Sequence, residues 1–241
     1  MKRSCSLLGT LILTGVLCLP VLAEGETWKD LNSQTSDLMH DKKFDEAIEP
    51  AKKTVDAAVK EFGPETAKTA SAMNTLAIAY KETGDKTAAE TYFKKVLNIR
   101  EKVLGPEDKD LAGPLENLAS MYGEEQKFAD AEPLLTRALD IKKKAYGEDD
   151  PFVGATKLRL AEVYKKQDKY SDAEPLYKEG LDMLEQAQYP NLKQVASVSD
   201  DLAMIYEKNG DSEAASQMKD HAKEALDKYE EIHRNEAAQE S

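Results

Sequence analysis

The residue types that most often carry chemistry are sparse in this chain. Its three histidines, His40, His221 and His233, have no histidine or cysteine at a metal-ligand spacing, so neither a metal site nor a histidine-driven catalytic group is expected. The acidic run at 148–150 lacks the alternating ligand pattern of a calcium loop. The sequence also lacks a glycine-rich phosphate loop, a nucleophile elbow and a zinc protease motif. We therefore expect no enzymatic activity, no catalytic residue, no metal and no cofactor.

A group of polar residues could instead bind another protein through hydrogen bonds and charge. They fall just before a recurring Leu-Ala pair or about one helical turn after it. The candidates for this partner-binding strip are Asn74, Lys81, Asn117, Arg159 and Lys165. Carboxylates at Glu116, Asp200, Asp201 and Glu207 interrupt the strip. Ordinary solvated helix surface is the alternative interpretation for each candidate.

These candidates lie in an array of internal repeats with a period of 42 residues. Gly63, Gly105 and Gly147 each open a copy, and Tyr189 takes the place of the glycine in a fourth. Other columns recur in phase, namely the pairs Leu76-Ala77, Leu118-Ala119, Leu160-Ala161 and Leu202-Ala203, then Tyr80, Tyr122, Tyr164 and Tyr206, then Ala89, Ala131, Ala173 and Ala215. A period of this length with helical hydrophobic spacing indicates stacked units, each of which needs a neighbour to bury its apolar face.

Each copy reads as two amphipathic helices. In the copy at 63–104, Met73, Leu76, Ala77 and Tyr80 are spaced i, i+3, i+4 and i+7, which places them on one face of a first helix. Gly84-Asp85 interrupts the pattern, and the same period then resumes over 89–97 as a second helix. The sequence therefore predicts a helix, a short turn and a second helix in every repeat.

The recurring columns have structural roles in this interpretation. A glycine after the second helix can adopt the left-handed conformation that closes a helix C-terminus, and Pro106 prevents that helix from continuing. The alanine column is expected where two helices cross closely, because a larger side chain would hold their axes apart. The tyrosine column is expected to pack in the core rather than to form a ligand cage.

The two ends of the array depart from the repeat pattern. We divide the chain into a leader at 1–23, a degenerate N-terminal repeat at 24–62, repeats at 63–104, 105–146 and 147–188, a C-terminal repeat with a capping helix at 189–234, and a flexible tail at 235–241. Lys219 and Lys223 replace residues that are apolar in the earlier copies. The last helix is therefore expected to be polar where no further repeat covers it.

A Leu-Ala pair, a tyrosine three residues later, a turn and an Ala-Glu pair together resemble the tetratricopeptide repeat. The 42-residue period is similar to the repeats of kinesin light chains and their bacterial relatives, and the segments KFADAEPLL at 127–135 and DKYSDAEPLY at 168–177 match closely. The resemblance implies an all-α, right-handed superhelical solenoid with a concave face that binds a protein or peptide. In carboxylate-clamp members of the family, Asn, Lys and Arg at the strip positions hold a peptide C-terminus, whereas the strip of this chain mixes charge signs.

The N-terminal segment has the features of a secretory signal peptide. Two positive residues at positions 2 and 3 precede an apolar run over 7–22, and small residues end at Ala23. The run is shorter than the roughly 20 residues of a membrane-spanning helix, which makes an uncleaved anchor the weaker alternative. We expect cleavage after Ala23 and export, to the periplasm of a bacterium or along a eukaryotic secretory route.

Charge and cysteine content restrict the partners of the exported chain. Cys5 and Cys18 both lie in the leader, so the chain from Glu24 onward would contain no thiol and no disulfide. Loss of Lys2 and Arg3 would change the formal net charge from −13 to −15. Such a chain is repelled by nucleic acid and anionic membranes. We expect a non-catalytic scaffold or adaptor, with a self-associating structural solenoid of the cell envelope as the alternative.

Overall fold

The computed structural model describes residues 27–188 and 190–239, and the predicted leader lies outside them. Apart from one short 3-10 turn, the regular elements in these ranges are α-helices. No helix in the described ranges is long and apolar enough to cross a membrane. The elements are α1 (Trp28–His40), α2 (Phe44–Phe62), α3 (Ala67–Thr83), α4 (Lys86–Leu104), η1 (Lys109–Leu111), α5 (Ala112–Glu124), α6 (Phe128–Tyr146), α7 (Pro151–Lys166), α8 (Tyr170–Glu185), α9 (Leu192–Asn209) and α10 (Ser212–Gln239).

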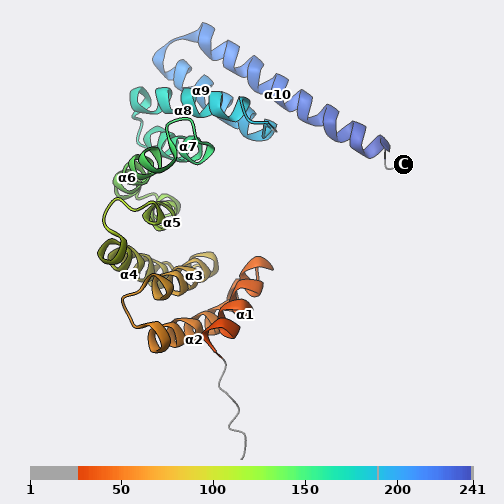
Figure 1. The fold of residues 1–241 in the computed structure, drawn as a ribbon. Coiled ribbons are helices and arrows are strands. Elements are labelled where there is room, and N and C mark those ends of the chain that lie inside the picture. The colour runs from red at the N-terminus through yellow and green to blue at the C-terminus, as the bar shows by residue number, and fades with distance from the viewer. Residues whose placement is uncertain (1–26, 189, 240–241) are drawn as a thin grey trace, which may run out of the picture.

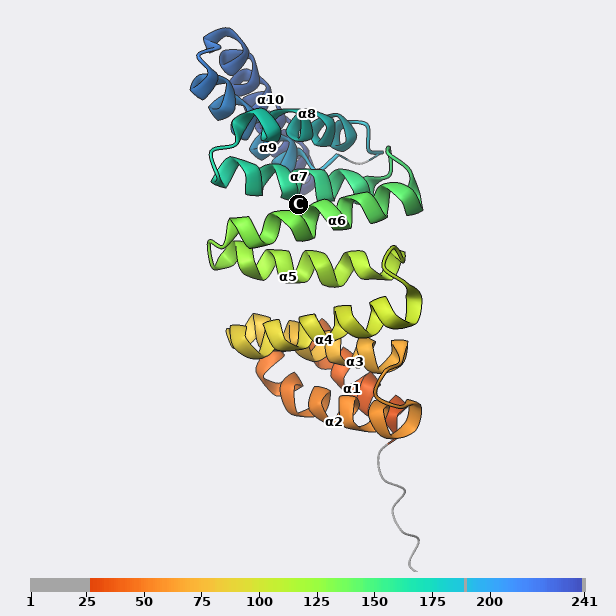
Figure 2. The same cartoon turned by 90° about the vertical axis from the view of Figure 1, so that its left-hand side faces the viewer.

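The helices pair in chain order into five hairpins that stack into a curved array (Figure 1). The first helices of the repeats, α3, α5, α7 and α9, line the inner side of the curve, and α4, α6 and α8 lie on the outer side (Figures 1 and 2). The predicted all-α superhelical solenoid is confirmed. The hairpin of α1 and α2 occupies the segment interpreted as a degenerate repeat, and α10 extends to Gln239, into the segment interpreted as a flexible tail.

The alanine column is buried in every hairpin. Ala89, Ala131 and Ala173 are fully buried, and Ala215 is 3% exposed. Ala47 is also fully buried and extends the column into the first hairpin. A small side chain lets neighbouring helices approach closely, so the burial of this column agrees with its expected place between packed helices.

The tyrosine column packs against the core as predicted. Tyr122 is buried, and Tyr80 stacks on Tyr92 with ring centroids 5.9 Å apart. Tyr164 and Tyr206 are partly buried against the same hydrophobic clusters. The tyrosines of the array therefore contribute to packing between helices.

The glutamates that follow Ala89, Ala131 and Ala173 accept hydrogen bonds from the next repeat, a role that was not apparent from the sequence. The carboxylate of Glu132 accepts hydrogen bonds from Lys169 Nζ at 2.6 Å and Gln167 Nε2 at 2.9 Å. The hydrogen bond from Lys169 is the main cause that lowers the pKa of Glu132. Glu90 accepts from the Tyr122 hydroxyl at 2.7 Å. These donors follow their acceptors by 32 to 37 residues, so Glu90 and Glu132 each connect their own repeat to the next.

The inner turns share one left-handed residue at a spacing of 42. The residues concerned are Lys42, Gly84, Gln126, Asp168 and Gly210, whose φ angles lie between 57° and 86°. The recurrence includes Lys42, so the first hairpin follows the same phase as the others. Only two of the five positions are glycine, which shows that the tight turn is imposed even where a side chain makes this conformation costly.

The glycines that end the outer helices have a different conformation from the one expected. Gly63, Gly105 and Gly147 have φ near 92° but ψ near 163°, so they are extended rather than left-handed helical. This region is essentially restricted to glycine. Glycine is therefore needed at these positions, as the sequence predicted. The prediction of an αL cap was wrong, because these glycines turn the chain out of the helix in a different conformation.

Replacing Gly105 by alanine is expected to lower the free energy of unfolding by about 1–3 kcal/mol. An added Cβ would meet nothing within 4 Å, so the cost comes from the backbone conformation alone. Gly123 in α5 is the matched control, because its Cβ would also meet nothing and its φ is not positive. Gly123→Ala should stabilise by up to about 1 kcal/mol. Urea unfolding followed by circular dichroism measures both, and equal effects of the two variants would contradict this account.

Candidate functional site

The inner side of the array contains a groove with a cavity volume of about 1040 Å³. It runs across four successive first helices, α3, α5, α7 and α9, which face the open side of the curve in Figure 1. Each helix contributes because the 42-residue period returns the same helix face to the same side of the array. The lining includes apolar Ala119, Leu135, Ala155, Leu158, Val163, Val198 and Tyr177, and neutral polar Asn117, Ser120, Gln194 and Ser197.

The floor of the groove is part of the hydrophobic core. Leu158 and Val198 are 7% and 5% exposed and belong to the cluster that joins α7 to α9. Ala155 and Ser197 are exposed at its rim. An apolar floor with polar groups along the rim is the usual chemistry of a surface that binds a peptide segment.

The structure places the five residues of the predicted partner-binding strip differently. Lys81, Asn117 and Arg159 line the groove. Lys165 reaches it through Asp201, a lining residue whose Oδ1 lies 2.7 Å from the lysine Nζ. Asn74 is not among the lining residues, and its buried Oδ1 has no hydrogen-bond partner in the described part of the chain.

The cations of the strip are paired with carboxylates of neighbouring helices. Lys81 Nζ lies 3.4 Å from Glu124, and a guanidinium nitrogen of Arg159 lies 3.5 Å from Glu116 Oε2. Lys165 contacts both Asp201 and Glu162. Glu116 and Asp201, which interrupt the strip in the sequence, are therefore the partners of its positive residues. The groove has little free positive charge to hold a carboxylate.

One end of the groove contains a buried tyrosine hydroxyl in a carboxylate network. Tyr177 is 2% exposed, and its hydroxyl donates to Glu162 Oε2 at 2.7 Å. Burial and this hydrogen bond raise the pKa of Tyr177 far above its ordinary value. Burial raises the pKa of Glu162, but hydrogen bonds from Lys165 and Tyr177 outweigh it and leave the pKa lowered. Tyr177 therefore stays protonated and acts as a donor that fixes Glu162 at the groove surface.

A buried polar triad lies behind the middle of the groove. Lys142 Nζ donates to Glu116 Oε1 at 2.7 Å and to Thr156 Oγ1 at 2.9 Å. The Thr156 hydroxyl also contacts Glu116 Oε1 at 2.6 Å. All three residues are buried and come from α6, α5 and α7. The triad could not be predicted from the sequence, because its members lie 14 to 40 residues apart and follow no motif.

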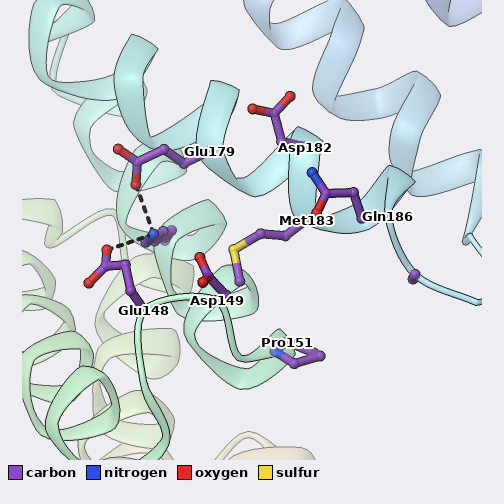
Figure 3. Close-up of a pocket in the computed structure, with 9 residues that line it drawn as sticks. Glu148, Asp149, Pro151, Glu179, Asp182, Met183 and Gln186 are labelled. Carbon is purple, nitrogen blue, oxygen red and sulfur yellow. Dashed lines mark ion pairs between the residues drawn. The ribbon is translucent and has the colours of Figure 1, made fainter.

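A second cavity, of about 460 Å³, lies at the edge formed by the α6–α7 loop and the end of α8 (Figure 3). Lys157, which is 3% exposed, lies between Glu148 and Glu179 at 2.9 and 2.8 Å. Burial lowers the pKa of Lys157, but hydrogen bonds to the two carboxylates outweigh it and raise the pKa overall. The charge of Lys157 is thus neutralised internally, and Asp149 and Asp182 also line the cavity.

Neither cavity has the ligands of a metal centre. Within the described residues, no group of three or more His, Cys, Asp or Glu side chains is placed to hold a metal ion. His221 contacts Glu185 at 2.8 Å and Ser199 at 2.9 Å, which joins α10 to α8 and α9.

Comparison with known proteins supports this architecture. The family model described as tetratricopeptide repeat matches residues 36–102 and 110–186, which is more than half of the chain. The first match begins inside the segment interpreted as a degenerate repeat. A comparison with curated proteins returned no significant match.

Several solved structures share the fold. The crystal structure of BtubC (BKLC) from P. vanneervenii has a TM-score of 0.74 and 18% identity, covering 84% of this chain and 80% of that one. A putative kinesin light chain with nearly identical TPR-like repeats from Podosopora anserina has a TM-score of 0.69 and 19% identity, covering 83% and 95%. MamA has a TM-score of 0.62 and 18% identity, covering 82% and 96%. Because this family model matches more than half of the chain and the helices stack as five hairpins, this chain belongs to the tetratricopeptide repeat family.

Proposed function

We propose that the protein is a non-catalytic scaffold or adaptor that binds a segment of another protein in its concave groove. The observation that carries this proposal is the continuous groove across α3, α5, α7 and α9, with its apolar floor and polar rim. Family membership supports the class of function, because tetratricopeptide repeats generally mediate contacts between proteins. The internal pairing of Lys81, Arg159 and Lys165 favours recognition through apolar contacts and neutral hydrogen bonds over a carboxylate clamp.

Filling the groove is expected to abolish partner binding without unfolding the protein. Ala155 and Ser197 are exposed lining residues, so Ala155→Arg with Ser197→Arg places two large side chains in the groove without opening the core. The matched control is Thr91→Arg, at an exposed position of α4 on the outer side. Crosslinking with envelope extracts followed by mass spectrometry should recover a partner with the wild type and the control only. If the groove variant recovered as much partner as the wild type, the groove would not be the binding site.

We also propose that the protein is exported and acts in the cell envelope. The positive, apolar and small residues of the first 23 positions support this location. N-terminal sequencing of the protein from its native cells should begin at Glu24. A chain that retains Met1 and fractionates with the cytoplasm would contradict export.

The second candidate function is self-association into a structural solenoid. It is favoured by α10, where Leu226 and Ile232 are each 42% exposed near the end of the array. Light scattering over a concentration series distinguishes the two functions. A mass that stays at one chain throughout the series would exclude self-association and leave the adaptor.

A further inference from the structure

His221 joins the last helix, α10, to two other helices through both of its ring nitrogens. Its Nε2 lies 2.8 Å from Oε1 of Glu185, the last residue of α8, and its Nδ1 lies 2.9 Å from Ser199 Oγ in α9. The Ser199 hydroxyl donates to Val195 O at 2.9 Å, one turn earlier in α9. Ser199 is fully buried, whereas the His221 side chain is 34% exposed, so the imidazole can exchange protons with solvent.

Both ring nitrogens of His221 face groups that accept hydrogen bonds. A carboxylate has no proton to donate, and the Ser199 hydroxyl already donates its proton to Val195 O. An imidazolium donates from both nitrogens and therefore completes all three hydrogen bonds. A neutral imidazole that keeps its bond to Glu185 can bond to Ser199 only if the serine proton turns away from Val195 O. Deprotonation of His221 thus removes one hydrogen bond and the charge of the ion pair.

The preceding repeat has a permanent cation at the equivalent contact. Lys157 and Glu179 stand 42 residues before Ser199 and His221, and Lys157 Nζ lies 2.8 Å from a carboxylate oxygen of Glu179. A lysine ammonium keeps its charge through neutral pH. In the last repeat the cation is instead a histidine, which changes its charge between about pH 5 and 8. The link between α9 and α10 therefore depends on pH, whereas the link between α7 and α8 does not.

The charged groups near this link favour the protonated form of His221. Among the carboxylates of the described residues, Glu185 is the one within 4.0 Å of a ring nitrogen. The other charged residues near the link in sequence are Asp182 of α8, Asp200 of α9, and Lys219, Asp220, Lys223 and Glu224 of α10. The two lysines are two positions from His221, so they lie on other sides of α10, whereas Glu224 is one turn away on the same side.

The contact matters because α10 covers the last hydrophobic cluster of the array. Ala222 and Ala225 of α10 are buried in this cluster together with Leu202 and Ile205 of α9. In the described chain α10 is the last helix, so its outer side is not covered by another repeat (Figure 1).

We propose that protonation of His221 controls how firmly α10 is docked, which makes the C-terminal cap of this array sensitive to pH. The docked state binds the extra proton, so its added stability is present at acidic pH and is lost as the pH rises through the range in which histidine deprotonates. At neutral and alkaline pH, α10 should open more often and uncover the apolar side of α9. This regulation does not depend on what binds in the concave groove.

Hydrogen–deuterium exchange followed by mass spectrometry tests the proposal at pH 5.5 and pH 8, with labelling times adjusted for the intrinsic exchange rate. Protection of the α10 amides in the wild type should fall by about threefold to tenfold more than that of the α3 and α4 amides between these pH values. In His221→Gln, which cannot become charged, α10 should show the same relative protection at both pH values. His40→Gln is the control, because His40 is 91% exposed and lies in α1, and it should keep the behaviour of the wild type.

A second variant removes the charge of the acceptor and leaves the histidine in place. Glu185 is 40% exposed at the end of α8, so Glu185→Gln should fold normally and reduce the pH dependence to less than about twofold. This variant decides the matter if His221→Gln loses the protection of α10 altogether. The proposal is overturned if α10 in the wild type is equally protected at both pH values relative to α3 and α4. It is also overturned if His221→Gln or Glu185→Gln retains the full pH dependence, or if His40→Gln loses it.

Discussion

Removal of Lys142 alone is expected to lower the free energy of unfolding by about 3–5 kcal/mol. The variant Lys142→Met keeps most of the side-chain volume but leaves the carboxylate of Glu116 buried without its closest cation. Glu116 is 8% exposed, and its other positive neighbour, Arg159, is 3.5 Å away on the opposite oxygen. A buried charge without a close partner is among the most destabilising changes that a single substitution can make.

Replacement of the whole triad should have a far smaller effect, because the chain itself contains an apolar version of it. One period later, the positions of Glu116, Lys142 and Thr156 are occupied by Leu158, Leu184 and Val198, which pack in one hydrophobic cluster. The triple variant Glu116→Leu, Lys142→Leu and Thr156→Val is therefore expected to be neutral or more stable than the wild type by about 1–4 kcal/mol.

Urea unfolding of the wild type, the single variant and the triple variant measures both effects in one experiment. The single variant should unfold at a clearly lower urea concentration than the other two. A triple variant that is less stable than Lys142→Met would show that the polar triad contributes net stability. It would also show that the junction between the second and third full repeats cannot accept the packing of the next junction.

Gly180→Ala is expected to destabilise the protein by about 1–3 kcal/mol. Gly180 lies in α8 where that helix touches α7, and an added Cβ would lie 2.4 Å from Leu158 Cδ2 and 2.6 Å from its Cγ. Leu158 must then move, and it forms part of the floor of the groove. We therefore expect the variant to weaken partner binding in the groove as well as to lower stability.

A double-mutant cycle with Leu158→Ala tests whether this contact is the cause. Leu158→Ala alone should cost about 2–5 kcal/mol, because it opens a cavity. The methyl group introduced by Gly180→Ala would occupy part of that cavity, so the double variant should be more stable than the sum of the two changes by about 0.5–3 kcal/mol. Gly113→Ala, whose Cβ would meet nothing within 4 Å, is the control and should not destabilise. Additive effects would assign the cost of Gly180→Ala to another source.

Secondary structure and repeat phase could be predicted from the sequence because both depend on local spacing. In the first full repeat, the sequence predicted a helix that contains Leu76 and Tyr80 and a turn at Gly84. In the structure, α3 ends at Thr83 and α4 begins at Lys86, so the turn lies where it was predicted. The alanine column could be predicted for the same reason, since a small residue at a helix crossing is needed in every copy. Helical periodicity and glycine positions are properties of neighbouring residues, so one chain is sufficient to recognise them.

The chemistry of the groove was decided by the tertiary structure. Lys165 and Asp201 are 36 residues apart, and Glu116 meets Lys142 and Thr156 across 26 and 40 residues. Such pairs depend on the angle and offset at which one repeat stacks on the next, which no local pattern encodes. For that reason the sequence alone identified polar residues of the inner face, whereas only the stacked helices determined which charges neutralise one another. The sequence determined that this protein is an array of helix pairs, and the superhelix determined which of its surfaces remain free to bind.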